Sequence, residues 1–326
     1  MKKLKTGLVF GKFLPLHNGH IALINFAKLH CEHLIVSMSY MPNDPIAPNL
    51  RFEWLNELFK DDKSIELVKK LDDFHDESLP IFEATKIWAA FIKQEFPTIE
   101  GFFCSENYGE PLSFHLNLPC IYFDIERNTI PISASAIRQN PFKHWQFIPD
   151  VVKPYFVKTI CLFGPESVGK TVLTEKLAKE FDTVFVHEVA RDFLTSNDFD
   201  QNTLIQIGEK HYELIIERKK IANKILFCDT EILTTQIYSR HYLQTIPDKL
   251  VEIEQDFKAD LYFLLDIDSP WVADPLRDLG DRRQEMFEIF KHELEKRNIN
   301  YVLIGGTWED RFSKMKEVIK TITKSV

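Results

Sequence analysis

Eight residues near the middle of the chain have the spacing of a phosphate-binding loop. Residues 164–171 read GPESVGKT, which matches the pattern GxxxxGK followed by Ser or Thr, between an apolar strand-like run and a helical pattern at 172–181. Glycines let the backbone curl so that its N–H groups and the next helix N-terminus converge on polyphosphate. Lys170 adds a positive charge, and the Thr171 hydroxyl can bind Mg²⁺. A plain glycine turn is the alternative to the predicted ATP site, whose loop residues are Gly164, Glu166, Ser167, Val168, Gly169 and Thr171.

Charged residues follow two neighbouring strand-like runs of the same half. Asp229 ends the run 225–229, the usual position of a carboxylate that holds the Mg²⁺ water shell beside a phosphate loop. It could also cap the next helix, and the two roles are compatible. Glu188 and Arg191 follow the run 183–187, and we expect them on the acceptor side of a kinase cleft. A surface ion pair is the alternative for these two.

The segment 271–283, WVADPLRDLGDRR, is charged and is marked by proline and glycine. We predict a lid that closes over bound phosphates with Arg277, Arg282 or Arg283, and we favour Arg277 and Arg283. Arginines on a polar helix are often simply solvated, which is the alternative for each of them.

Two histidines near the start of the chain form a second candidate phosphate site. Residues 10–20 read FGKFLPLHNGH, so His17 and His20 share one turn between a strand-like run and a helical pattern at 21–30. Imidazoles near a helix N-terminus can donate hydrogen bonds to phosphate oxygens, and the helix dipole favours the anion. A zinc site is the alternative, and the absence of a third ligand at metal spacing nearby disfavours it.

The segment 132–138, ISASAIR, supplies a matching element at the other end of this half. The hydroxyls of Ser133 and Ser135 and the first-turn N–H groups would form another anion site, and Arg138 lies one turn beyond Ser135. A short serine-capped helix is the alternative. Because both elements stand in one α/β half, we predict that they act together on phosphates.

Short apolar runs alternate with helical patterns in both halves, which implies parallel sheets with ligands at the carboxyl ends of the strands. The segment 140–154 contains three prolines, so we predict two α/β domains at 1–155 and 156–326. The expected strands are 8–11, 34–38, 101–105 and 120–124 in the first half, and 159–164, 183–187, 225–229, 261–266 and 301–304 in the second.

The composition indicates a soluble globular protein. With 40 Lys and Arg against 49 Asp and Glu, the net charge of −9 disfavours nonspecific binding to nucleic acid. The five cysteines are scattered without a CxxC pair, as expected for buried thiols in a reducing compartment. The basic start lacks a cleavage site, and no window approaches the apolar length of a membrane span. We therefore expect the cytoplasm.

The motifs together resemble a known family. GKFLPLHNGH with ISASAIR resembles the nucleotidyltransferase superfamily that transfers AMP from ATP to a small phosphate acceptor. Followed by NPFKHWQFIP and GPESVGKT, they resemble the bifunctional nicotinamide-mononucleotide adenylyltransferase/ribosylnicotinamide kinase (NadR-like) family over essentially the whole chain. Ser135 stands where the superfamily often has Thr, which retains the hydroxyl. The resemblance implies an N-terminal Rossmann-like nucleotidyltransferase and a C-terminal P-loop kinase.

The resemblance also implies two successive reactions with ATP and Mg²⁺. The kinase would phosphorylate nicotinamide riboside, and the transferase would join the mononucleotide to AMP, giving NAD and pyrophosphate. The mononucleotide phosphate is itself a nucleophile, so the transferase needs phosphate-stabilising groups and no general base. For the kinase, Asp229 and Glu188 both remain candidates to orient or deprotonate the riboside hydroxyl. The transferase groups expected to contact ATP are Gly11, Lys12, Phe13, His17, His20, Ser133, Ser135 and Arg138.

Nicotinamide in these substrates is a cationic aromatic ring, so each site should offer a stacking surface. The candidates are Trp88 or Tyr108 in the first domain and Trp271 in the second. A core position is the alternative for Trp88, which lies in the helical pattern IWAAF.

Two other functions remain open. The same folds could act on another acceptor, or the chain could be a nucleotide-sensing protein that regulates a transporter or another partner. Some family members carry an extra N-terminal helix-turn-helix domain, whereas this sequence begins at the first strand, so we expect an enzyme without a repressor role. A link to a riboside transporter would fit the pathway, and a homo-oligomer is possible; the sequence shows neither.

Overall fold

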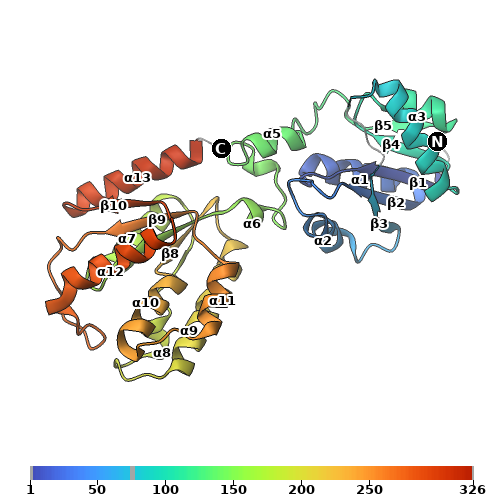
Figure 1. Ribbon diagram of the computed structural model, residues 1–326. Coiled ribbons are helices and arrows are strands. Elements are labelled where there is room, and N and C mark those ends of the chain that lie inside the picture. Colours follow the sequence, from blue (N-terminus) through green and yellow to red (C-terminus); the bar gives the residue numbers. More distant parts are fainter. Residues whose placement is uncertain (1–2, 74–77, 325–326) are drawn as a thin grey trace. The chain divides into compact units, whose positions relative to one another are not determined.

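The computed structural model describes residues 3–73 and 78–324, which form two compact units. The division falls between Lys153 and Pro154, inside the proline-marked segment. Each unit contains one five-stranded sheet whose strand pairs are all parallel, as the alternation of runs predicts (Figure 1).

The first unit has the strand order β3-β2-β1-β4-β5. Leu8 of β1 is in register with Ile35 of β2 and with Phe102 of β4, so the three side chains form a buried row across the sheet. Helices α3 and α4 pack on this row. The strands are β1 (Leu4–Gly11), β2 (Cys31–Tyr40), β3 (Ile65–Leu71), β4 (Gly101–Cys104) and β5 (Cys120–Tyr122). The helices are α1 (Asn18–His30), α2 (Pro48–Phe59), α3 (Ile81–Glu95), α4 (Gly109–Leu116), α5 (Ala134–Gln139) and the 3₁₀ turn η1 (Trp145–Phe147), and α6 (Lys153–Phe156) leads into the second unit.

The connections of the first sheet define where a ligand can bind. From β1 the chain runs outward to β2 and β3, and then returns to β4 on the other side of β1. The loops after β1 and β4 therefore leave the sheet on opposite faces, which opens a crevice at the carboxyl ends of these two strands. The loop that follows β1 carries His17 and His20.

The second unit has the strand order β10-β9-β6-β8-β7, with β6 at the corresponding switch point. Its two faces are covered by separate clusters: Leu162, Phe227 and Phe263 pack against α7 and α13, whereas Phe163 and Tyr262 pack against α10 and α12. The strands are β6 (Lys158–Phe163), β7 (Phe185–Val186), β8 (Ile225–Asp229), β9 (Leu261–Leu265) and β10 (Tyr301–Ile304). The helices are α7 (Lys170–Glu180), α8 (Ala190–Phe193), α9 (Gln201–Lys219), α10 (Ile232–Leu243), α11 (Asp248–Asp256), α12 (Arg283–Lys296) and α13 (Trp308–Lys324), with the 3₁₀ turn η2 (Gly280–Arg282).

Candidate active sites

The phosphate loop joins β6 to α7 and has the curled backbone that its glycines predict. Gly164 and Gly169 have φ values of 139° and 89°, and Ser167 between them has φ 61°. A Cβ atom on Gly169 would lie 2.2 Å from the Trp308 ring, so only glycine fits there. The Lys170 ammonium donates to the carbonyl oxygens of Gly164 at 3.0 Å and Pro165 at 2.7 Å. The lysine is therefore held across the loop, beside the start of α7.

A carboxylate and a hydroxyl meet beside this loop. The register of β6 with β8 pairs Leu162 with Asp229, and the Thr171 hydroxyl donates to Asp229 Oδ2 at 2.5 Å. Asp229 is fully buried, and within the described residues its Oδ1 has no hydrogen-bond partner. Burial, followed by the nearby Glu188, raises the pKa of Asp229 to about 6. Mg²⁺ prefers hard oxygen ligands and would satisfy this orphaned oxygen, so the pair fits the ion expected with ATP.

Replacing Asp229 with asparagine should stabilise the metal-free protein, because the change removes a buried charge and keeps an acceptor for Thr171. We expect the melting temperature near pH 8 to rise by roughly 3–6 °C, for a gain of about 1–2 kcal/mol. The variant should also lose the extra stabilisation that Mg²⁺ gives to the ATP-bound protein. Differential scanning fluorimetry can measure both effects, with exposed Glu209→Gln on α9 as the control. An unchanged response to Mg²⁺ would contradict the predicted metal site.

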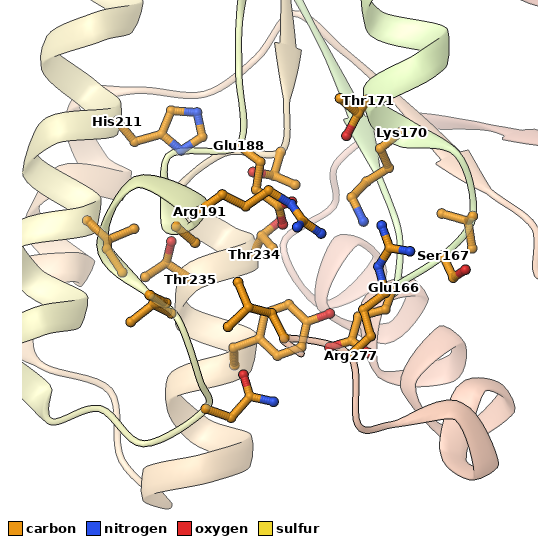
Figure 2. A pocket seen from close by; sticks show the side chains of 18 of the residues that line it. Glu166, Ser167, Lys170, Thr171, Glu188, Arg191, His211, Thr234, Thr235 and Arg277 are labelled. Atoms are coloured by element: carbon orange, nitrogen blue, oxygen red, sulfur yellow. The ribbon is translucent and has the colours of Figure 1, made fainter. Parts of the chain in front are cut away.

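The loop opens into a cavity of about 160 Å³. Figure 2 shows Lys170 and Arg191 reaching into it from opposite sides, with Glu188 beside Arg191. Arg191 is held by two carboxylates, since Nε donates to Glu188 at 2.8 Å and Nη1 to Asp274 at 3.0 Å. Arg277 also lines the cavity and donates to the Val272 carbonyl at 3.0 Å. Three cations and Glu188 thus surround the space in front of the phosphate loop.

Other residues of the predicted lid hold the segment against the loop. The Ser167 hydroxyl accepts from the Val272 N–H at 2.8 Å, and Arg283 donates to the Ser269 carbonyl at 2.9 Å. The Arg283 guanidinium lies 5.6 Å from the centre of the Trp271 ring. Neither Arg283 nor Trp271 is among the described residues that line the cavity. Arg282 is exposed and pairs with Glu285, so Arg277 is the lid arginine that this structure brings to the cavity.

In the first unit, His17 caps α1 and thereby fixes its own tautomer. Its Nδ1 accepts from the N–H groups of Gly19 at 3.1 Å and His20 at 3.4 Å, so the proton of the neutral ring lies on Nε2. The two rings stack at 3.7 Å between centroids. Burial and Arg127 lower the pKa of His17 to about 4, and burial, His17 and Arg127 lower the pKa of His20 well below its usual range. Both imidazoles are thus neutral donors near pH 7 rather than cations.

The ISASAIR element meets this loop through Arg138. Its guanidinium donates to the Leu14 carbonyl and, at 3.1 Å, to the Ser135 hydroxyl. Ser133 caps α5, with its hydroxyl accepting from the Ala136 N–H at 3.2 Å. Ser133 and Ser135 line the histidine cavity, whereas Arg138 is outside the lining formed by the described residues. Arg138 therefore ties the two motifs together in this structure.

The histidine cavity, of about 500 Å³, is also lined by a cation that the motifs do not reveal. Arg127 lines it and pairs with Glu106 at 2.7 Å. Its loop is shaped by Asp124, whose carboxylate accepts from the N–H groups of Thr129 and Ile130. Buried Arg51 on α2 donates to the carbonyl of Lys12, which lines the same cavity, and pairs with Asp44. In the sequence, Arg127 is only a single basic residue a few positions before ISASAIR, so no motif marks it as a site residue.

An aromatic cavity adjoins the histidine cavity and shares Phe10, Gly11, Lys12 and Tyr108 with it. Trp88 and Tyr108 meet edge to face at 5.6 Å between ring centroids, and both line this cavity. Trp88 also packs against the core beneath α3, and its stacking on nicotinamide stays a prediction. Within 3–73 and 78–324, no group of three or more His, Cys, Asp or Glu side chains has the arrangement of a metal site.

The sequence did not predict most of the residues in one wall of the second-unit cavity, which we call the far wall because it lies away from the phosphate loop. This wall comes from α8, α9, α10 and the loop after α8, and it is mainly apolar with a few polar groups. One pattern in the sequence could have revealed part of this wall. Thr234, Tyr238 and Tyr242 are spaced four residues apart, which puts them on one face of α10. The wall residues are Leu194, Asn197, Phe199, Leu204, Ile207, His211, Thr234, Thr235, Tyr238 and Tyr242.

Comparison with known proteins relates the whole chain to one group. Residues 159–311 match the model of an AAA domain. The chain is 32% identical to the trifunctional NAD biosynthesis/regulator protein NadR of Escherichia coli strain K12, over 98% of this chain and 83% of that protein. Identity and coverage are the same for NadR of Salmonella typhimurium strain LT2. A crystal structure of a NadR protein in complex with NR shares the fold, with a TM-score of 0.79, 22% identity and coverage of 99% of this chain and 97% of that one. With relatives of this identity matching nearly its full length, the chain belongs to the NadR family.

Proposed function

We propose that the chain is a bifunctional enzyme of NAD biosynthesis. The second unit would phosphorylate nicotinamide riboside with ATP, and the first would join the resulting mononucleotide to AMP, releasing pyrophosphate. The supporting observation is that two separate cavities, each lined by residues of a predicted phosphate motif, stand at the switch points of two parallel sheets, in a chain whose relatives are named for NAD biosynthesis. One similar structure contains NR, and another contains NAD and AMP-PNP.

The geometry of the second unit suggests separate roles for its two acidic candidates. Asp229 is buried and bonded to Thr171, so these two would hold Mg²⁺, which neutralises charge on the ATP phosphates. Glu188 lines the cavity and faces the space where an acceptor hydroxyl would lie, so we assign it to orient that hydroxyl and accept its proton. Lys170, Arg191 and Arg277 would stabilise charge on the transferred phosphoryl group.

The first unit would act by positioning and charge stabilisation. The mononucleotide phosphate attacks the α-phosphorus of ATP, the bond to the β-phosphate bridging oxygen breaks, and pyrophosphate leaves with that electron pair. His17 and His20 would donate hydrogen bonds to the phosphates, and Arg127 and Lys12 would supply positive charge. We place the nicotinamide ring in the aromatic cavity beside Trp88 and Tyr108.

We also propose that the enzyme works in the cytoplasm with ATP and Mg²⁺. Five free cysteines, four of them buried, suit a reducing compartment. No helix in the described part of the chain is long and apolar enough to cross a membrane. We propose residues 1–155 as the adenylyltransferase domain and residues 156–326 as the kinase domain. The division of the chain into two compact units between Lys153 and Pro154 supports these limits.

A product assay tests the proposal directly. Purified protein is incubated with ATP, Mg²⁺ and either nicotinamide riboside or the mononucleotide, and the products are separated by chromatography. NAD from both substrates would support two activities in one chain. Mononucleotide that accumulates without NAD would leave only a kinase, whereas no product from either substrate would favour another acceptor or a nucleotide sensor.

A further inference from the structure

A fully buried arginine lies behind the phosphate loop of the second unit. Arg311, on α13, is 1% exposed, although burial of a charge is costly unless the group is well paired. Its Nη1 donates to the carbonyl of Val168, inside the loop, at 2.8 Å, and its Nε donates to the Gly306 carbonyl at 3.1 Å. Its Nη2 donates to the Asp266 carbonyl at 3.0 Å and pairs with the Asp268 carboxylate. One guanidinium thus joins the phosphate loop to the segments that follow β9 and β10.

The contact with Val168 determines the direction of a backbone N–H group. The bond between Val168 and Gly169 is trans, and the C=O and N–H of a planar trans peptide point in opposite directions. Because Arg311 holds the Val168 carbonyl, the Gly169 N–H points away from Arg311. Val168 and Gly169 line the cavity, whereas Arg311 is not among the described residues that line it. The Gly169 N–H is therefore directed to the side where ATP phosphates would lie.

Trp308 supports the same peptide unit from its other end. Its ring packs so closely on Gly169 that a Cβ there would lie 2.2 Å from a ring atom. The Arg311 guanidinium is 5.9 Å from the centre of this ring. Gly169 has φ 89° and belongs to a loop, so no sheet ladder fixes its conformation. The start of α13 therefore supplies the rigid surface on which this part of the phosphate loop rests.

Stability of the fold does not by itself require an arginine at this position. Replacing buried ionic groups with apolar side chains of similar volume is often neutral or stabilising. Met315 and Ile319, spaced four residues apart from Arg311 on the same face of α13, are apolar and buried in the adjoining core. The arginine differs from them in supplying hydrogen-bond donors to three carbonyl groups from three segments of the chain.

We propose that Arg311 is a positioning residue that orients the phosphate loop for ATP. It acts through the Val168–Gly169 peptide, which it keeps in the orientation that presents an N–H to the phosphates. ATP that meets a loop already in its binding conformation loses less free energy to ordering. This inference rests on the ATP site of the kinase proposed above.

Separate KM values for the two substrates test this role. Arg311→Met keeps much of the side-chain volume and removes the donors, so we expect the KM for ATP in riboside phosphorylation to rise by about 10- to 100-fold, with the KM for the riboside unchanged. Arg311→Lys keeps the charge and loses the planar fork, and it should raise the KM for ATP by about 3- to 10-fold. The KM for ATP in NAD formation should stay at the wild-type value in both variants, because the histidine site lies in the other unit.

Ile319→Ala is the matched control, because it loosens the same helix two turns beyond Arg311. It should lower the melting temperature and leave the KM for ATP unchanged. An unchanged KM for ATP in Arg311→Met would overturn the inference, and so would an equal rise in Ile319→Ala. If Arg311→Met does not fold, Arg311→Lys decides, and a wild-type KM for ATP in that variant would overturn the inference.

Calorimetry with AMP-PNP and Mg²⁺ provides a readout that does not depend on turnover. We expect two sites in the wild type, one in each unit, and a loss of affinity at one of them in the Arg311 variants. If the wild type phosphorylates no riboside, the kinase function fails, and the calorimetry still decides the role of Arg311. Equal binding of AMP-PNP by the wild type and the folded variant would overturn that role.

Discussion

Lys170→Ala is expected to abolish riboside phosphorylation while leaving NAD formation from added mononucleotide intact. The Lys170 ammonium is the cation held within the phosphate loop, by the carbonyl groups of Gly164 and Pro165. In the reaction this charge would move onto the phosphates, where a preorganised cation in a partly enclosed site is worth far more than in water. We expect kcat/KM for the riboside to fall by about 10³-fold or more, measured by chromatography of the products.

Two comparisons separate this effect from loss of the fold. Lys179→Ala removes an exposed lysine from the same helix, α7, and should leave both activities at the wild-type level. NAD formation from the mononucleotide serves as an internal control, because the histidine site lies in the other compact unit. Loss of both activities in a variant with a wild-type melting temperature would contradict two independent sites.

The local signals in the sequence predicted the sheets and the loops well. GPESVGKT and the two-histidine loop each belong to a short strand–turn–helix unit whose residues are close in sequence, so their positions at strand ends follow from periodicity. Strand β3 was not predicted, since its sequence IELVKKL carries three charged residues and forms a sheet edge, where one side of the strand is only partly covered.

Contacts between side chains from distant segments could not be predicted from the spacing of residues along the sequence. Arg138 and Arg283 were expected to reach phosphates, yet their guanidinium groups donate to carbonyl oxygens of Leu14 and Ser269. Arg127 and His211 belong to the cavities only because the fold brings their loop and helix there. A guanidinium five bonds from its backbone has many possible partners, and only the folded chain selects among them.

His20→Ala should give the opposite result, abolishing NAD formation from the mononucleotide and sparing riboside phosphorylation. His20 lines the first-unit cavity and stacks on His17, but it does not cap α1, so its removal leaves the helix start intact. Loss of one donor to the phosphates is expected to lower kcat/KM by about 10²- to 10³-fold. His33→Ala, which removes a β2 histidine paired with Glu66, is the control and should leave both rates unchanged.

The protonation state of the histidines also predicts how NAD formation depends on pH. The lowered pKa values of His17 and His20 keep both rings neutral, so no histidine should lose a catalytic proton as the pH rises. We therefore expect no decline in kcat/KM for NAD formation as the pH rises from about 6 to 8, and we expect His20→Gln, with its neutral N–H donor, to recover part of the rate lost in His20→Ala. A rate that declined through pH 6.5, with no recovery in His20→Gln, would mean that a cationic imidazole carries the reaction. In the apo protein, the contribution of His17 and His20 to the free energy of unfolding should decrease as the pH falls from about 6.5 toward 4, because a pKa lowered by folding makes the unfolded chain bind more protons. The raised pKa of Asp229 contributes in the opposite direction over this range.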